Sequence, residues 1–357
     1  MKILYIVYAA TGHHIPYINA LLDPDNENIF IVPGQIEGLP GKQYVLPYVL
    51  NRGKRDIVSH LKWLKKVSLI ARNERADVVH FTYGDMLYKS FGLRLNRMNG
   101  SCIVVSFHRM DKSFLKRISR DLIMRKADFT TYHVADAYKM VPVSLRDKSC
   151  FTAYPSVLEN IVISKSDARK MLGIDTGVPV ISVTGIMDEY KGLDVLFDAL
   201  EQVRSGYYLI IAGKPLFYSA EYIEERLKGL KCGSTKLLRF LSDKEFVACI
   251  SASDIVAVPY LKSFEGTSGP MTEGIRMGKT IVGCSHGNIG CYIERYKIGY
   301  ACEGGDPDSL AAALEKAIKK PVEYAGKMND LVKMQTVGAF KDRFRDIYAE
   351  VYKRKRR

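Results

Sequence analysis

The sequence predicts an α/β protein with two parallel-sheet domains, and three observations support this class. The chain of 357 residues is longer than one ordinary domain and, at 47% hydrophobic residues, can build two cores. Short apolar runs of strand length alternate with amphipathic stretches of helix length, which is typical of parallel strands covered by helices. The alternation breaks off once, near residues 150–165, and then resumes.

Each half of the chain contributes its own series of elements. In the first half, we expect strands at 3–8, 28–32, 77–81, 102–107 and 128–132, with long helices at 54–74 and 112–126. In the second half, we expect strands at 179–184, 207–212, 236–240, 254–258 and 280–284, with helices at 191–204, 219–229, 243–251, 270–277 and 308–319.

The break between the two series marks the domain boundary. The segment CFTAYPSVLENIVISK at 150–165 contains a proline and has no clear period. We therefore predict an N-terminal Rossmann-like domain over 1–158 and a C-terminal one over 159–336. The basic amphipathic helix expected at 337–357 is predicted to pack back on the N-terminal domain.

Composition narrows the class of protein further. The seven cysteines are scattered, without a CxxC pair or zinc-ligand spacing, so we expect reduced thiols in a cytoplasmic protein and no metal site. No stretch approaches the roughly 20 apolar residues that a membrane span needs. The first apolar run, ILYIVYAA at 3–10, favours a buried strand over a secretory signal.

The net charge of +14 is concentrated in the first half of the chain. Residues 1–155 carry 23 Lys and Arg against 13 Asp and Glu, a balance of +10, whereas the remaining residues carry 30 against 26. Such a field attracts nucleic acid, an anionic membrane leaflet or phosphate-bearing substrates. Because no helix-turn-helix, RNP motif or zinc finger is present, we expect no nucleic-acid partner.

The most informative stretch is PYLKSFEGTSGPMTEGIRMGKTIVG at 259–283. A loop of small residues leads to Pro270, which suits the first turn of a helix, and Gly278 follows the helix end. The unpaired N–H groups and positive pole of such a helix start form a site for a diphosphate. The residues expected to line it are Gly266, Thr267, Ser268 and Gly269.

Two carboxylates frame this loop, Glu265 ahead of it and Glu273 in the first turn of the helix. A carboxylate accepts charge-assisted hydrogen bonds from vicinal hydroxyls, so one can meet a ribose and the other a transferred sugar. The alternative is an ordinary capped helix, with Glu273 complementing the helix dipole and Glu265 on the surface.

The spacing from Glu265 to Glu273, followed by Gly-Lys and a strand, resembles the hallmark of the retaining glycosyltransferases of family 4. Further blocks match in order over about residues 165–320: VTGIMDEYKGLDVLFDAL, LIIAGKP, LLRFLSDKEFVACISASDIVAVPY and GNIGCYIERYKIGYACEGGDPDSLAAALEKAI. The resemblance implies the GT-B fold, in which two Rossmann-like parallel-sheet domains face a central cleft.

The resemblance also implies an activity and a set of roles. The enzyme would be a metal-independent, retaining hexosyltransferase that uses a UDP- or GDP-linked sugar as co-substrate and needs no other cofactor. Lys191 would neutralise the leaving diphosphate, Gly185 would line the donor loop, and Phe240 and Leu241 would sit against the base. Glu265, Lys191 and His108 would be the catalytic group.

In the N-terminal half the resemblance is looser. Thr11-Gly12-His13 occupies the place of the glycine loop that approaches the donor, so Gly12 is a predicted donor contact; an ordinary strand-to-helix turn is the alternative. The segment IVVSFHRMD resembles the strand that ends in a histidine near the sugar, which would place His108 on the transferred sugar. A structural histidine at a strand end is the competing interpretation.

The sequence departs from the family pattern in two places. Where a basic residue commonly follows the first strand of the C-terminal domain, this chain has Gly185-Ile186-Met187. Lys191 would then carry more of the phosphate charge, or Arg109, Lys214 or Lys262 would substitute. The usual Asn-Gly linker is replaced by Tyr154-Pro155-Ser156.

The acceptor implied by the resemblance is a glycan or a lipid-linked saccharide, as in polysaccharide assembly. Residues 51–72 and 113–126 both interleave basic and apolar residues, which suits peripheral contact with an anionic membrane at the inner face of the cell. A helix with its apolar side in the core is the alternative for each stretch.

Other functions fit the same architecture. A sugar-nucleotide epimerase or phosphorylase would share the phosphate pocket but need no glycan acceptor, and a catalytically silent module would bind nucleotide or glycan without turnover. A dinucleotide oxidoreductase is disfavoured because no strand is followed by Gly-x-Gly-x-x-Gly.

Overall fold

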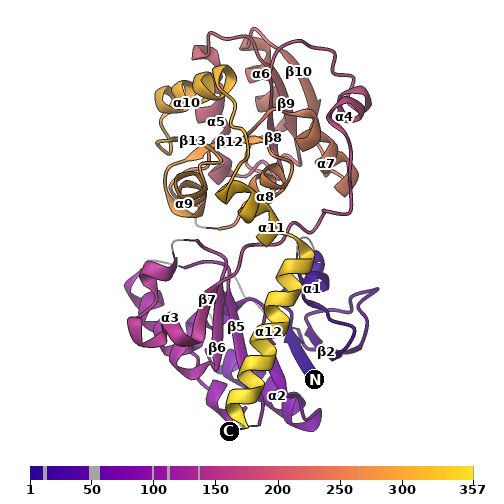
Figure 1. The fold of residues 1–357 in the computed structure, drawn as a ribbon, viewed down its shortest axis with the longest axis vertical. Helices are drawn as coiled ribbons and strands as arrows, with labels where there is room; N and C mark the ends of the chain where they lie inside the picture. The colour runs from indigo at the N-terminus through magenta and orange to yellow at the C-terminus, as the bar shows by residue number, and fades with distance from the viewer. Residues whose placement is uncertain are drawn as a thin grey trace. The chain divides into compact units, whose positions relative to one another are not determined.

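The computed structural model of the chain describes residues 1–10, 14–47, 57–98, 100–110, 113–135, 137–264 and 266–356. The chain divides into two compact units, Met1–Pro155 with Val337–Arg357, and Ser156–Thr336. Each unit contains one parallel β-sheet with helices packed on it (Figure 1). The predicted α/β class with two Rossmann-like domains is therefore confirmed.

The N-terminal unit is built on a sheet whose described strands are all parallel to their neighbours. Their order is β3-β2-β1-β4-β5-β6-β7, so the order reverses at β1. The strands are β1 (Lys2–Ile6), β2 (Glu27–Val32), β3 (Lys42–Val45), β4 (Val78–Phe81), β5 (Cys102–Phe107), β6 (Phe129–Tyr132) and β7 (Ser149–Phe151).

Helices lie between strands of this unit, and one more comes from the end of the chain. They are α1 (His14–Leu21), α2 (Ile57–Asn73), α3 (Phe114–Lys126) and α12 (Val337–Lys355), with short 3-10 turns η1 (Gly84–Ser90), η2 (Leu95–Arg97), η3 (Ala137–Met140) and η4 (Val143–Lys148). The apolar face of α2 packs into the core through Trp63, Leu64 and Val67, which are buried.

The C-terminal helix α12 belongs to the N-terminal unit, although the chain runs through the whole second unit before reaching it. The Tyr348 hydroxyl lies 2.7 Å from Nδ1 of His80 on β4, and the Cys102 thiol donates to the carbonyl of Val351 at 3.4 Å. Phe340 and Phe344 are buried on the same helix. A basic, amphipathic segment thus covers one face of the first sheet.

The C-terminal unit is built on a second parallel sheet, with the strand order β10-β9-β8-β11-β12-β13 among its described residues. The order reverses at β8, which pairs with β9 on one side and β11 on the other. The strands are β8 (Val180–Thr184), β9 (Tyr208–Ala212), β10 (Gly233–Leu237), β11 (Ile255–Val258), β12 (Thr280–Cys284) and β13 (Gly299–Cys302).

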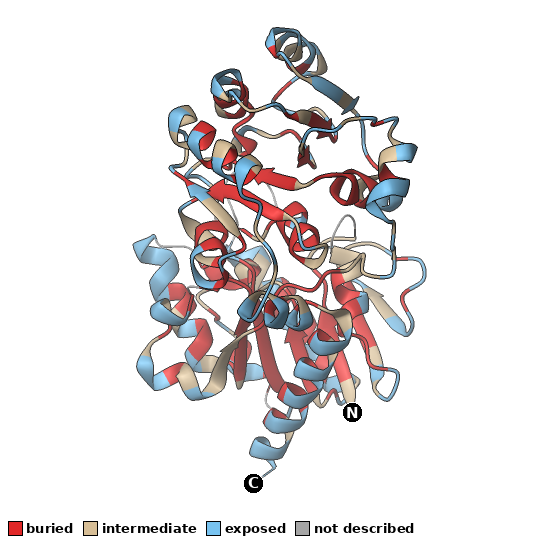
Figure 2. Cartoon of the chain, turned by 45° about the horizontal axis from the view of Figure 1, so that its top comes forward, coloured by how far each residue is buried: buried red, intermediate tan, exposed pale blue. Residues whose placement is uncertain are grey.

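Helices flank this sheet in the order expected of a doubly wound fold. They are α4 (Lys165–Met171), α5 (Leu193–Gln202), α6 (Ala220–Gly229), α7 (Asp243–Ala252), α8 (Gly269–Arg276), α9 (Gly287–Tyr296), α10 (Pro307–Lys319) and α11 (Lys327–Met334), with the turn η5 (Glu189–Lys191) before α5. Figure 2 shows the strands of both units as mainly buried and the outer faces of the helices as exposed.

One strand lies three residues from its predicted place. The sequence predicts a strand at 236–240 because its apolar residues cluster there, whereas β10 spans Gly233–Leu237. This strand is at the edge of the sheet and is largely exposed, so it tolerates polar residues and gives a weak apolar signal. Phe240 therefore lies in the turn beyond the strand.

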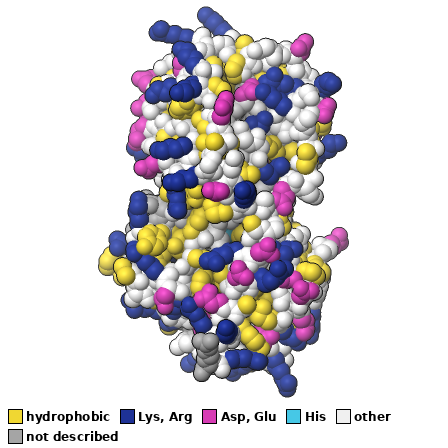
Figure 3. Space-filling view, in the orientation of Figure 1, with side chains coloured by type: hydrophobic (Ala, Val, Ile, Leu, Met, Phe, Trp, Pro, Cys, Tyr) yellow, Lys and Arg dark blue, Asp and Glu magenta, His cyan; other side chains and the backbone are white. Residues whose placement is uncertain are grey.

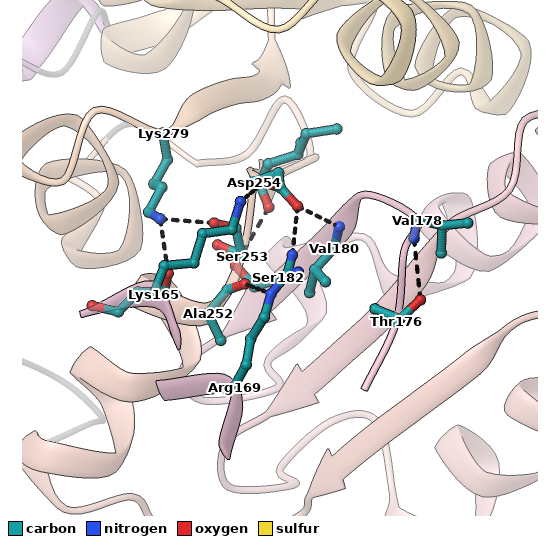
Figure 4. A network of polar contacts seen from close by, with 12 residues as sticks. Lys165, Arg169, Thr176, Val178, Val180, Ser182, Ala252, Ser253, Asp254 and Lys279 are labelled. Atoms are coloured by element: carbon teal, nitrogen blue, oxygen red, sulfur yellow. Dashed lines mark hydrogen bonds and ion pairs between the residues drawn. The ribbon is translucent and has the colours of Figure 1, made fainter. Parts of the chain in front are cut away.

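An ion-pair network around Asp254 connects the amino ends of the central strands of the second sheet (Figure 4). Its carboxylate accepts from the backbone N–H of Val180 at 2.8 Å and from Nη2 of Arg169 at 2.9 Å, and it pairs with Lys165. The network ties α4 to β8 and β11. It occupies the end of the sheet opposite the carboxyl ends, where ligands bind in open α/β sheets.

Lys279 of the Gly-Lys pair belongs to the same end of the sheet. Its ammonium donates to the carbonyls of Ser251 and Ser253, both at 2.8 Å, and thus satisfies the last turn of α7. Burial lowers the pKa of Lys279 to about 8. Its place in the motif is explained by these structural bonds.

Within the part of the chain that the structure describes, no helix is both long and apolar enough to cross a membrane.

Candidate functional site

The carboxyl end of the second sheet, where the strand order reverses between β8 and β11, is lined by glycines. Gly185 follows β8 with φ of 107°, and Gly213 follows β9 with φ of 148°. A Cβ at Gly213 would lie 1.8 Å from the carbonyl oxygen of Gly185, so only glycine fits there. The two loops are thereby held close together, with the Lys191 ammonium 3.2 Å from the place of a Cβ at Gly185.

Lys191 is buried beneath this edge. Its ammonium donates to the carbonyl of Thr184 at 3.2 Å and to the hydroxyl of Tyr260 at 2.5 Å, and lies 4.3 Å from the centre of the Tyr260 ring. Burial lowers the pKa of Lys191 to about 8, and the nearby Tyr190 and Asp188 partly offset this effect. The lysine is thus a buried cation with fixed hydrogen-bond partners and is not a solvated side chain at a helix start.

The loop that leads into α8 begins directly beyond β11. Ser268 caps the helix, its hydroxyl accepting from the N–H of Met271 at 3.3 Å, and Pro270 lies in the first turn. The hydroxyls of Tyr260 and Ser268 are 3.1 Å apart. Tyr260 therefore links Lys191 to the helix start. Sequence reasoning missed this connection because Tyr260, although it lies in the informative stretch, was assigned no role there.

The helix start itself matches the prediction in its residues. Gly266, Thr267 and Ser268 precede α8, and Gly269 is its first residue. A Cβ at Gly269 would meet no atom within 4 Å, so this glycine leaves open space at the helix end. Glu265 lies outside the described residues.

Glu273 is buried and held by two partners. Its Oε2 accepts from the hydroxyl of Ser156 at 2.8 Å and from Nε of Arg276 at 2.7 Å. Among the described residues, Oε1 has no hydrogen-bond partner. The carboxylate is therefore oriented by internal bonds that use one oxygen. The prediction that Glu273 lies in the first turn of the helix is wrong, because α8 begins at Gly269 and Glu273 is its fifth residue.

Of Phe240 and Leu241, which are predicted to face the base, one side chain is exposed and the other is buried. Phe240 is 72% exposed in the turn after β10, whereas Leu241 packs in a core cluster with Ala248 and Ile210. Of the two side chains, the Phe240 ring is the one available for stacking on a flat ligand.

The three candidate substitutes for the missing cation differ in their surroundings. Lys262 pairs with Glu303 at 2.5 Å. Lys214 is exposed, follows β9 next to Gly213, and its carbonyl accepts from the N–H of Met187 at 2.9 Å. Arg109 belongs to the other unit, where its carbonyl accepts from the Tyr88 hydroxyl. Lys214 is thus bonded through its backbone to the segment that lacks a basic residue.

In the N-terminal unit, His108 directly follows β5 and is buried. Its Nε2 lies 2.8 Å from the carbonyl oxygen of Thr82, and because a carbonyl only accepts, Nε2 carries the proton. The ring stacks on Tyr83 with centroids 3.9 Å apart and meets His133 edge-on at 4.6 Å. Gly12 lies outside the described residues.

His108 is part of a ring cluster that sequence reasoning missed. Nδ1 of His133 donates to the carbonyl of Thr152 at 2.9 Å, so its Nε2 accepts from the Tyr17 hydroxyl at 2.8 Å. Burial lowers the pKa of His133 to about 4. The signal was present in the sequence: a tyrosine or histidine follows five strands within three residues, namely Tyr8, Tyr83, His108, His133 and Tyr154.

Within the described residues, no group of three or more His, Cys, Asp or Glu side chains is arranged to hold a metal ion.

Two Rossmann-like sheets, one ending in a glycine-lined edge beside a helix start, define the GT-B class. Solved structures with this fold match nearly the whole chain. Sucrose-phosphate synthase from Thermosynechococcus elongatus is 15% identical with a TM-score of 0.75, covering 99% of this chain and 100% of that one. HepE from Anabaena in complex with UDP is 16% identical with a TM-score of 0.72, covering 98% and 100%.

The sequence comparison covers a smaller part of the chain. Residues 164–333, which make up most of the C-terminal unit and less than half of the chain, match the model of glycosyl transferases group 1. The granule-bound starch synthase 1 of Pisum sativum is 27% identical over 165 residues, which cover 42% of this chain. The match spans 26% of the length of that synthase.

Proposed function

We propose that the protein is a retaining, metal-independent glycosyltransferase that moves a hexose from a UDP- or GDP-linked sugar to a hydroxyl of a glycan or lipid-linked saccharide. The observation that carries the proposal is the joined arrangement of Lys191, Tyr260 and the capped start of α8 at the switch point of the second sheet. The UDP and UDP-glucose held by HepE structures agree with a nucleotide-sugar donor.

The central demand on the site is the charge of the leaving diphosphate, which grows as the glycosidic bond breaks. Preorganised donors directed at developing charge are usually the largest catalytic contribution. Here they would be the N–H groups of Thr267, Ser268 and Gly269, with the ammonium of Lys191 as one cation and that of Lys214 as the second. Gly185 would let the backbone approach the phosphates closely, while Gly213 lets its own loop pack against Gly185.

The remaining roles follow from the same placement. Oε1 of Glu273 would accept from a ribose hydroxyl, while Ser156 and Arg276 hold the other oxygen. Phe240 would stack on the base, with the backbone of Leu241 beside it. Glu265 would bind hydroxyls of the transferred sugar, and His108 and Gly12 would be the contribution of the N-terminal unit.

The transfer step needs no nucleophile from the protein. The acceptor oxygen would form its bond to the anomeric carbon on the face from which the diphosphate leaves. The bond between that carbon and the diphosphate oxygen breaks with its electron pair remaining on the phosphate, and a phosphate oxygen takes the acceptor proton. This course retains the anomeric configuration.

The first experiment is a thermal-shift screen of the full chain in EDTA against UDP, GDP, ADP, CMP and their common sugar conjugates. A ligand that binds only the folded state stabilises it by about 2.7 kcal/mol at 100 times its Kd, so one nucleoside diphosphate should raise Tm clearly. The shift should be lost in Glu273→Gln and kept in the matched control Glu225→Gln, an exposed carboxylate paired with Lys228. An equal shift in Glu273→Gln would count against the assignment of this carboxylate.

Turnover then separates the alternatives. A transferase releases nucleotide quickly only when an acceptor is added, an epimerase converts the donor alone, and a silent module does neither. NMR of the product anomeric proton tests retention, and an inverted product would overturn that part of the proposal. A requirement for Mg²⁺ would contradict metal independence.

A further inference from the structure

Helix α3 presents an apolar stripe to solvent. Phe114 is 74% exposed, Leu115 66%, Ile118 39% and Leu122 36%. Because these positions are spaced by three and four residues, they lie on one side of the helix, chiefly over its first two turns. Single exposed apolar residues are common, but four in one stripe mark an interaction surface.

The opposite side of α3 explains why these residues are not needed in the core. That side buries Ile123 and Met124 together with two polar residues. The Ser119 hydroxyl donates to the carbonyl of Tyr88, and the buried Arg120 donates to Asp121 and to the carbonyl of Met140. The helix is thus anchored partly by polar bonds, while its largest apolar side chains point outward.

The surroundings of the stripe are basic. The helix carries five Lys and Arg against one Asp, and Lys116, Arg117 and Arg125 are exposed. Figure 3 shows hydrophobic side chains gathered over α3 with Lys and Arg beside them. The whole N-terminal unit has 31 Lys and Arg against 16 Asp and Glu, a balance of +15, whereas the C-terminal unit has 22 against 23.

We propose that this stripe, formed by Phe114, Leu115, Ile118 and Leu122, docks the protein on an anionic lipid bilayer. The apolar side chains would enter the headgroup region with α3 lying along the surface, and Arg117 and Arg125 would remain among the anionic headgroups. Charge complementarity selects this occupant: a second copy of the chain would bring an equally basic unit against this one.

The inference extends the proposed function, because a surface-bound enzyme meets a lipid-linked acceptor, but it can fail independently. The residues of α3 are assigned no part in donor binding. Membrane binding is therefore measured without donor, and donor binding without membrane.

The experiment is co-sedimentation of the full chain with vesicles of phosphatidylcholine alone or with 30% phosphatidylglycerol added. Wild type should bind only the anionic vesicles, and 0.5 M NaCl should weaken binding. Phe114→Ser with Leu115→Ser should reduce the partition coefficient at least tenfold. Replacing Arg117 or Arg125 by Gln should reduce it about fivefold each, since one basic residue near the surface contributes about 1 kcal/mol.

Matched controls are Val45→Ser and Val162→Ser, which remove exposed apolar side chains elsewhere and should bind vesicles like wild type. Nucleotide-dependent thermal shifts should be the same in all variants, which shows that each is folded. No binding to anionic vesicles, or unchanged binding in the double variant, overturns the proposal. A dimer in light scattering that the double variant abolishes, without vesicle binding, would assign the stripe to a second copy.

Discussion

The carboxyl edges of the two sheets carry different chemistry on similar topologies. In both sheets the strand order reverses at the first strand, β1 in one and β8 in the other. The edge after β8 is lined by glycine backbone over one buried lysine, whereas the edge of the first sheet is lined by tyrosine and histidine rings. The fold thus provides the place, and the residues after each strand decide the chemistry.

The difference extends to protonation. Burial lowers the pKa of His133, at the edge of the first sheet, to about 4 and that of His80, inside β4, to about 3, so both imidazoles are neutral at pH 7. Lys191, with a pKa of about 8, remains mostly an ammonium at that pH. One edge therefore offers a positive charge suited to phosphate, and the other offers neutral donors, acceptors and ring faces suited to a sugar or another uncharged group.

Removing Lys191 is the most direct test of this difference between the two edges. Lys191→Met fills the same space without charge, and we expect kcat/KM for the donor to fall about 100- to 1000-fold, because the charge that stabilises the leaving group is lost. The matched control is Lys279→Met, which removes a half-buried lysine from the amino ends of the strands and should lower stability more than turnover. A wild-type rate in Lys191→Met would contradict the assignment.

The pH profile gives a second readout of the same lysine. Because the free enzyme needs the ammonium form, kcat/KM should fall as pH rises above about 8. Lys191→Arg, if it turns over, should lose this limb since guanidinium stays charged. A profile in Lys191→Arg that still falls near pH 8 would assign the limb to another group.

A smaller effect, on the stability of the N-terminal unit at low pH, is expected from the neutral histidines His80 and His133. Both pKa values lie below the unfolded value near 6.5, so the unfolded state binds protons first as pH falls. The part of the free energy of unfolding that depends on their neutral form is fully present above pH 6.5. It is lost progressively as pH drops toward 4, by about 1.4 kcal/mol per pH unit for each imidazole. Chemical unfolding followed by Trp63, the single tryptophan, measures this in the N-terminal unit.

Replacing His80 by Leu and His133 by Gln should flatten this dependence between pH 6.5 and 5, even if the variants are less stable overall. His286→Gln, in the other unit, should leave the Trp63 transition unchanged. An equally steep dependence in the double variant would show that other groups cause the acid sensitivity.

The smallest expected effect is on the affinity for the nucleotide, through stacking on its base. Phe240→Ala should weaken nucleotide binding about fivefold, because an aromatic stack contributes about 1 kcal/mol. Phe217→Ala removes an exposed ring after the neighbouring strand and serves as the matched control. Isothermal titration calorimetry with the nucleotide found in the thermal-shift screen measures the Kd of both variants. A larger loss of affinity in Phe217→Ala would assign the stacking on the base to Phe217, after β9.

The two basic amphipathic stretches, residues 51–72 and 113–126, show how much a sequence pattern can predict. Both suggested a membrane surface from the same mixture of basic and apolar residues. In α2 the structure buries Trp63, Leu64 and Val67 and leaves Ile57 and Leu69 exposed, so most of its large apolar side chains near the middle of the helix pack in the core. In α3 the corresponding residues are exposed. The spacing defines an apolar side in each helix, but only the neighbours of the helix decide whether that side is covered.

The sequence alone determined the α/β class, the central strands and the small-residue loop before α8. Strands such as β5 and β8 are buried on both sides, so their continuous apolar runs are visible without any structure. Edge strands β3, β7 and β13 escaped prediction because partial exposure permits short, polar sequences.

Only the tertiary structure decided which separate segments meet. It joined Lys191 to Tyr260, oriented Glu273 through Ser156, and gathered rings from separate strand ends around His108. Local propensity acts over a few residues, whereas these contacts join groups 69 and 117 positions apart. They exist because parallel strands bring their carboxyl ends to one edge, a long-range consequence of sheet order that no single motif records.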